Sequence, residues 1–155
     1  MWETEIQSFG DYLKIERGLS KHSHEAYLRD IQKLATYLSV SPIAIDQVNE
    51  SHILAFLKDL HSLGIEASTQ SRTLSGIRAF FQFLVFDGTL KADPTVHVKN
   101  PQMGRKLPDT LSFDEITAIL EQADLSSPEG VRNRAMLEFL YGAGLRVSEL
   151  IGLKR

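Results

Sequence analysis

The sequence contains no cysteine, which excludes disulfide bonds and metal sites built on thiolates. It also has no run of eighteen apolar residues, the length that a membrane-spanning helix needs. The first residues, Met-Trp-Glu-Thr-Glu, lack the basic and apolar regions of a secretory signal. These absences fit a cytoplasmic location, and they leave the class of the protein open.

An excess of positive charge is lacking as well. The formal net charge is −3, which argues against a module whose whole surface binds DNA. Residues 1–20 carry 2 basic and 4 acidic side chains, residues 21–106 carry 10 and 8, and residues 107–155 carry 5 and 8. The middle segment is therefore the only candidate for a surface that faces phosphate groups. Its excess is small, so composition does not decide whether the ligand is a nucleic acid.

Apolar residues recur every three or four positions in four segments of residues 1–92, which predicts four amphipathic helices. A glycine, a proline or an Asp-Gly pair follows each segment and indicates where the helix ends. Short connections between such helices are typical of a bundle with one modest core. The positions that define the helices are Ile6, Phe9 and Leu13; Tyr27, Ile31, Leu34 and Leu38; Ile53, Leu54, Leu57 and Leu60; and Leu74, Ile77, Phe81, Leu84 and Val85.

Polar side chains that accept hydrogen bonds from backbone N–H groups indicate where these helices begin. We expect Ser20 or Ser23 to cap the second helix, and Asn49 or Ser51 to cap the third. The fourth is expected to open at Ser68.

Residues 93–110 interrupt the helical pattern. Three prolines stand seven residues apart in this segment, which forbids a continuous helix. Lys99, Arg105 and Lys106 make the segment basic. We therefore predict a basic linker between two domains.

Residues 111–155 resume the helical pattern. Ser112 and Glu115 have the spacing of a capping box, and Pro128 is typical of the first turn of the next helix. These helices are strongly apolar, and no further element follows to close a core. A segment of about forty-five residues rarely folds alone, so we expect the first part of a larger domain.

The most informative stretch reads Tyr-Gly-Ala-Gly-Leu-Arg-Val-Ser-Glu-Leu over residues 141–150. Arg146 follows a Gly-x-Gly helix ending and precedes a new apolar helix. A guanidinium held there suits a phosphate, because it donates two parallel hydrogen bonds and keeps its charge when desolvated. The spacing also fits a helix-start arginine paired with Glu149, three residues on. The residues alone leave both interpretations open.

The stretch resembles the first catalytic-arginine motif of the tyrosine recombinases (phage-integrase family), and the Xer type most closely. The resemblance extends along the chain: residues 23–38 and 71–81 look like the second and fourth helices of the family's core-binding domain, and residues 107–112 like the entry to its catalytic domain. Residues 134–150 follow with the family's spacing. The resemblance implies an all-α chain with three parts. Residues 1–92 would form a four-helix, SAM-like core-binding domain, and residues 93–110 a linker. Residues 111–155 would form the first helices of a catalytic domain that is cut off soon after it begins.

The resemblance also implies a chemistry. In the family a tyrosine attacks a DNA phosphate, forms a 3′-phosphotyrosyl link and releases a 5′-hydroxyl. Arg146 would be the first of two phosphate-clamping arginines, and Glu149 a buried supporting carboxylate. The family's nucleophilic tyrosine and its other catalytic residues are not found in this sequence, so we expect the 155-residue chain alone to be inactive. No metal or cofactor is expected, because the tyrosine stores the phosphodiester energy covalently. The implied partners are double-stranded DNA and other recombinase protomers in a homo- or hetero-tetramer.

Arginines and short polar side chains near the start of the fourth predicted helix are candidates for DNA contact. Hydroxyl groups and helix N-termini suit phosphates, and arginine reaches either phosphate or guanine. The basic residues of the linker are candidates as well, because in the family the linker passes beside the duplex. An ordinary solvated helix face explains the same pattern. The candidates are Thr69, Gln70, Ser71, Arg72, Ser75, Arg78, Lys99, Arg105 and Lys106.

Two further functions fit the same residues: a DNA-binding regulator without chemistry, and a helical module that binds other proteins. His22 and His24 do not predict a metal site, because residues two apart in a helix point to different faces; we expect both to be solvent-exposed. The four tyrosines, which lie near apolar helix positions, are expected in the core or at its rim.

Overall fold

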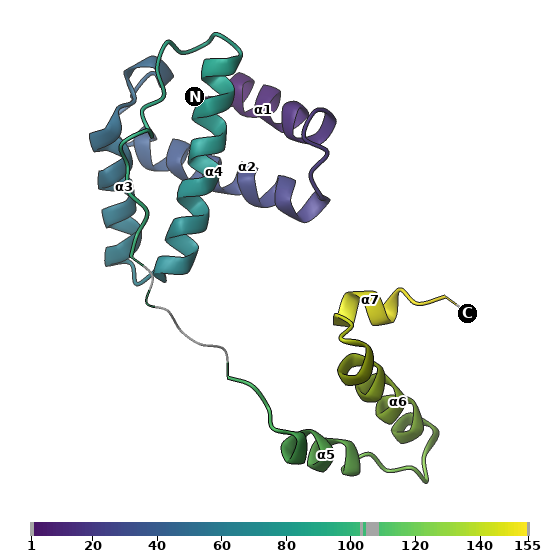
Figure 1. Cartoon of the computed structure of the whole chain (residues 1–155). Helices are drawn as coiled ribbons and strands as arrows, with labels where there is room; N and C mark the ends of the chain where they lie inside the picture. The colour runs from purple at the N-terminus through teal and green to yellow at the C-terminus, as the bar shows by residue number, and fades with distance from the viewer. Residues whose placement is uncertain (1, 103, 105–108, 155) are drawn as a thin grey trace. The chain divides into compact units, whose positions relative to one another are not determined.

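A computed structural model describes residues 2–102, 104 and 109–154. These residues form seven α-helices and one short 3-10 helix, and no β-strand occurs among them. The predicted all-α class is confirmed. The chain divides into two compact units, Met1–Gly104 and Arg105–Arg155 (Figure 1).

The first unit contains four helices that begin and end close to the predicted positions. Ser20 caps the second of them by accepting a hydrogen bond from the Ser23 backbone N–H at 3.3 Å, and Asn49 caps the third in the same way. The fourth helix begins at Ala67, one residue before the predicted start at Ser68, and follows Glu66. The elements are α1 (Glu3–Ile15), α2 (Lys21–Ser39), the 3-10 helix η1 (Ile45–Gln47), α3 (Glu50–Ser62) and α4 (Ala67–Phe86).

The core of this unit lies where α2 and α4 pack against each other, with α1 against both and α3 on the same two helices (Figure 1). Most of the predicted apolar positions are buried. Leu54 is an exception, because it faces solvent with 45 % of its surface exposed while Phe56 fills the core instead. Aromatic rings form the centre: the Phe9 and Phe80 ring centroids lie 5.3 Å apart, and Trp2 stacks on Phe80 at 6.2 Å.

The chain continues to pack on the bundle after α4 ends. Thr95 and Val98 are buried, and the Asp93 carboxylate accepts hydrogen bonds from the Thr95 backbone N–H and hydroxyl at 2.7 and 2.6 Å. In Figure 1 this segment turns back along the bundle. The compact unit therefore reaches Gly104, so the first part of the predicted linker belongs to it. A helix is absent from residues 93–102, as the prolines predict.

The second unit consists of α5 (Phe113–Glu121), α6 (Pro128–Ala143) and α7 (Val147–Ile151). The predicted capping box is confirmed, because the Ser112 N–H donates to Glu115 Oε2 at 2.7 Å and the Glu115 N–H donates to Ser112 Oγ at 3.3 Å. The backbone N–H of Ser112, and then its hydroxyl, hold the pKa of the Glu115 carboxyl below its ordinary value. Arg134 joins α6 to α5 by donating to the Leu120 carbonyl at 3.1 Å.

Apolar side chains of the second unit remain largely exposed. Among its described residues Gly130 alone is buried, and none contributes to the hydrophobic core. The exposed fractions reach 70 % for Phe113, 55 % for Phe139 and 71 % for Ile151. Local hydrogen bonds at the helix ends thus define these helices, whereas burial of apolar surface contributes little.

We expect Gly76→Leu to destabilise the first unit, because a Cβ at this position would stand 3.2 Å from Tyr27 Cδ1 and 3.4 Å from Asp30. Overpacking of this kind costs about 1–3 kcal/mol. Trp2 is the only tryptophan and is buried in this unit, so its fluorescence during urea unfolding reports the change. Ser75→Leu is the matched control, since it adds the same side chain at the exposed neighbouring position. Equal stability of the two variants would contradict close packing at Gly76.

We expect the 155-residue chain to self-associate as its concentration rises, because the exposed apolar side chains of the second unit favour contact between molecules. Sedimentation velocity over a range of concentrations measures this directly. Replacing Phe139 and Ile151 by serine should shift the distribution towards monomer. A chain that stays monomeric at every concentration would show that the exposed surface of the second unit is not sufficient for association.

Candidate nucleic-acid interface

A buried carboxylate joins α2 to α4. Asp30 has no exposed surface, and its two oxygens accept hydrogen bonds from the two terminal nitrogens of Arg72, at 2.5 Å from Nη1 to Oδ2 and 3.1 Å from Nη2 to Oδ1. The Thr73 hydroxyl donates to Oδ1 at 3.2 Å, and Lys33 Nζ lies 3.9 Å from the same oxygen. Sequence reasoning missed Asp30 and Thr73. In the sequence Asp30 directly precedes Ile31, and Thr73 directly precedes Leu74, and both of these apolar residues are buried in the core.

Arg72 is one of the predicted contact residues and remains accessible although it is paired. Its side chain is 46 % exposed, whereas that of Asp30 is fully buried. Lys33 is 47 % exposed on α2, so basic groups of both helices lie beside the buried acid. Arg29, next to Asp30, is exposed too. This part of the surface combines positive charge with a fixed geometry, which is what a phosphate or a base edge requires.

Arg78, the second predicted arginine of α4, is engaged within the unit. Its Nη1 donates to Asn100 Oδ1 at 2.8 Å, and its Nη2 donates to the Val98 carbonyl oxygen through a short hydrogen bond. Arg78 therefore fastens the segment after α4 to the helix. Lys99 lies between these two contacts and is exposed. A role of Arg78 in DNA contact would act through this segment as well as through its own side chain.

The other predicted contact residues differ in their access to solvent. Gln70 is buried, with only 4 % of its surface exposed, and its amide nitrogen donates to the Ile65 carbonyl at 2.7 Å. Ser75 is exposed, and its hydroxyl donates to the Ser71 carbonyl at 2.9 Å. Thr69 and Ser71 are half-buried. Arg105 and Lys106 lie outside the residues that the structure describes.

Arg146 stands at the turn between α6 and α7. Gly144 ends α6 in the left-handed conformation, with a φ of 62°, and Arg146 itself is extended. Its backbone N–H donates to Glu149 Oε2 at 2.7 Å, and its Nη1 donates to Glu149 Oε1 at 3.0 Å. The helix-start pair that the spacing predicts is therefore present. Glu149, which the resemblance implies to be buried, is 47 % exposed, and the Arg146 side chain is 82 % exposed.

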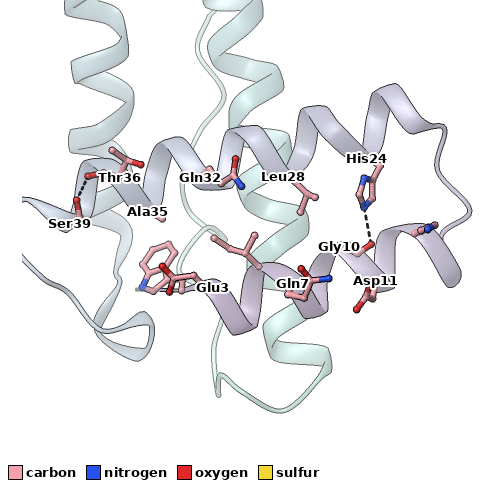
Figure 2. Close-up of a pocket in the computed structure, with 13 residues that line it drawn as sticks. Glu3, Gln7, Gly10, Asp11, His24, Leu28, Gln32, Ala35, Thr36 and Ser39 are labelled. Carbon is pink, nitrogen blue, oxygen red and sulfur yellow. Dashed lines mark hydrogen bonds between the residues drawn. The ribbon is translucent and has the colours of Figure 1, made fainter.

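A pocket of about 720 Å³ lies between α1 and α2 (Figure 2). Its lining residues belong to these two helices and Trp2, and none of them belongs to α4. Its charged lining residues include both signs, Glu3 and Asp11 with Lys14, so the pocket has no pronounced charge of one sign. Figure 2 shows the His24 ring reaching across from α2 to the Gly10 carbonyl oxygen, at 3.1 Å from Nε2. His24 is half-buried, so its predicted solvent exposure is wrong.

The described residues contain no group of three or more histidine, aspartate or glutamate side chains placed to hold a metal ion. None of their helices combines the length and the apolar character needed to cross a membrane.

Comparison with known proteins gives matches along nearly all of the chain. The chain is 41 % identical over 155 residues to a protein named tyrosine recombinase XerD from Oceanobacillus iheyensis, a match that covers 99 % of this chain and 52 % of that protein. It is 39 % identical over 153 residues to the protein of the same name from Staphylococcus saprophyticus, covering 98 % and 52 %. The corresponding protein of Pseudomonas aeruginosa is 38 % identical over 148 residues, covering 96 % and 50 %. The chain thus spans about half the length of the curated relatives it matches.

Two family profiles match the chain in sequence order. The profile described as "Phage integrase, N-terminal SAM-like domain" matches residues 6–88, which include α2, α3, α4 and all of α1 after its first three residues. The profile described as "Phage integrase family" matches residues 109–155, which include α5, α6, α7 and the Arg146 turn. The bundle and the turn are the features from which the resemblance was drawn. The chain therefore belongs to the phage integrase family, the tyrosine recombinases.

Proposed function

We propose that this chain is the DNA-binding part of a site-specific tyrosine recombinase. The observation that carries the proposal is the match of almost the whole chain to proteins named tyrosine recombinase XerD, at 41 % identity in the first of them. The first unit matches the family's N-terminal SAM-like domain. The second unit matches the family profile over residues that include Arg146. In this function the chain acts in the cytoplasm on double-stranded DNA.

The first unit would hold the duplex through the surface where α2 and α4 meet. Arg72 and Lys33 supply positive charge there, and the exposed Ser75 supplies a hydroxyl on the same helix as Arg72. Lys99 would add a phosphate contact where the chain leaves the bundle, with Arg78 fixing that segment. Gln70 is not part of this surface, because its amide is buried and engaged within the unit.

Arg146 would stabilise the scissile phosphate. A planar guanidinium can donate two parallel hydrogen bonds to phosphate oxygens and offset the charge that develops in the transition state. The extended backbone after Gly144 sets the side chain free of α6, and Glu149 holds one of its terminal nitrogens. Glu149 then orients the guanidinium, and Arg146 supplies the charge. The strand cleavage itself would need a tyrosine nucleophile and the second arginine of the family, which this sequence does not provide.

We expect the 155-residue chain alone to bind duplex DNA without forming a covalent adduct, and further protomers to assemble with it on DNA only when the catalytic half is present. The alternative of a DNA-binding regulator differs in having no catalytic half at all. The alternative of a protein-interaction module predicts no duplex binding. The nucleotide sequence that follows the codon of Arg155 separates the first two, and a DNA titration separates the third.

Binding of a fluorescent duplex should weaken steeply between low and moderate salt, because basic side chains that contact phosphates release counterions. Lys99→Gln should lower the slope of log K against log salt by about one. Lys58→Gln, a change of the same kind on the exposed face of α3, is the matched control and should leave the slope unchanged. Binding that does not depend on salt, or a covalent protein–DNA product, would contradict the proposal.

Arg146→Lys should abolish most strand cleavage in a protein that joins this chain to the downstream half of the catalytic domain, because lysine cannot donate the bidentate pair. We expect a loss on the order of 100-fold or more on a suicide substrate, with site binding retained. In the 155-residue chain the same change should barely alter duplex affinity. Cleavage by the lysine variant at the wild-type rate would assign Arg146 to the helix-start pair with Glu149 only.

A further inference from the structure

The pair formed by Asp30 and Arg72 is asymmetric. The acid is fully buried and the arginine side chain is 46 % exposed. A buried carboxylate is strongly unfavourable unless donors satisfy it, and here Arg72 and Thr73 together supply three hydrogen bonds. The carboxylate is thus held in place by the core of the bundle, and it holds in turn a side chain that reaches the surface.

The way in which Arg72 is held leaves one edge of its guanidinium unused. A guanidinium has five N–H donors in a planar fork, and Asp30 takes one from each terminal nitrogen. Within the described part of the chain, Arg72 Nε makes no hydrogen bond. The edge that combines Nε with one terminal nitrogen therefore keeps two parallel N–H donors.

Two acceptors at the spacing of those donors occur both on a phosphate and on the major-groove edge of guanine, which presents O6 and N7. The charge distinguishes the two. Asp30 offsets the positive charge of Arg72, so the pair attracts phosphates less than a free arginine would. What the pair retains is a fixed orientation, and fixed orientation is what the reading of a base edge requires. Lys33, exposed beside it, is the side chain suited to phosphate.

We infer that Asp30 is a positioning residue that sets the Arg72 guanidinium to read a guanine in the major groove, so that Arg72 determines sequence preference more than affinity. The inference rests on the proposed function, because it needs α4 to face DNA. Gly76 supports the same arrangement: it lies one helical turn after Arg72 and lets α2 and α4 approach closely beside the Asp30 side chain.

The test is selection from a pool of randomised duplexes with the full chain, followed by sequencing of the bound fraction. Wild-type protein should enrich guanine at one position by roughly 5- to 150-fold over other bases, the discrimination expected of one bidentate pair. Arg72→Lys and Asp30→Asn should both lose this preference. Arg72→Lys should also keep the wild-type salt dependence, because it keeps the positive charge. Lys58→Gln is the control, since it changes a basic residue outside the α2–α4 surface and should keep the preference.

Trp2 fluorescence shows which variants are folded. If Asp30→Asn is unfolded, Asp30→Glu takes its place, because it keeps the negative charge and moves the carboxylate by one methylene, which displaces the Arg72 guanidinium that the carboxylate holds. A merely structural role of Asp30 would lower stability without changing the base preference of the folded protein. An unchanged preference in either folded variant therefore overturns the inference.

Two other outcomes separate this inference from the proposed function. Arg72→Gln that weakens all duplexes alike and lowers the salt slope by about one would make Arg72 a phosphate contact. A wild-type chain that binds duplexes with steep salt dependence but without base preference would exclude base reading. In both cases the proposed function stands and the inference fails. A wild-type chain that binds no duplex overturns both.

Discussion

The buried carboxylate of Asp30 is the interaction on which the first unit depends. It sits where α2 meets α4, and it draws Arg72 and Thr73 of α4 onto α2. A buried acid tolerates only a narrow set of geometries, because any displacement leaves it short of donors. The two helices therefore have one register, and Gly76 permits the approach that this register requires. The aromatic core around Phe80 instead joins α4 to Phe9 of α1 and to Trp2.

The two arginines of α4 show how one residue type acquires two roles from its surroundings. Arg72 meets a buried acid and remains half exposed, which makes it available to a ligand. Arg78 meets the Val98 carbonyl and the Asn100 side chain, which makes it a fastening for the chain that follows the helix. Both lie in one helix, so the surface that would contact DNA and the exit of the linker are fixed by the same element.

The second unit is built differently. Local hydrogen bonds define its helices: Ser112 and Glu115 cap α5, Ser127 caps α6, and Glu149 closes the turn at Arg146. Its described apolar side chains are mostly exposed, and no hydrophobic core forms among them. These helices lie within the match to the phage integrase family at residues 109–155, and the chain spans about half of each relative.

The sequence by itself determined the helices, the capping box at Ser112 and the family, because apolar periodicity, capping and the motif around Arg146 are local properties of the chain. The structure decided that Ser20 and not Ser23, and Asn49 and not Ser51, cap the second and third helices. It did not determine which polar side chains are free. Gln70 and Arg72 stand two residues apart with similar polarity, yet one is buried and the other reaches solvent, since helix rotation against α2 decides between them. Asp30 became visible only once α2 and α4 were packed, because its partners lie more than forty residues away and their contact is a property of the tertiary structure.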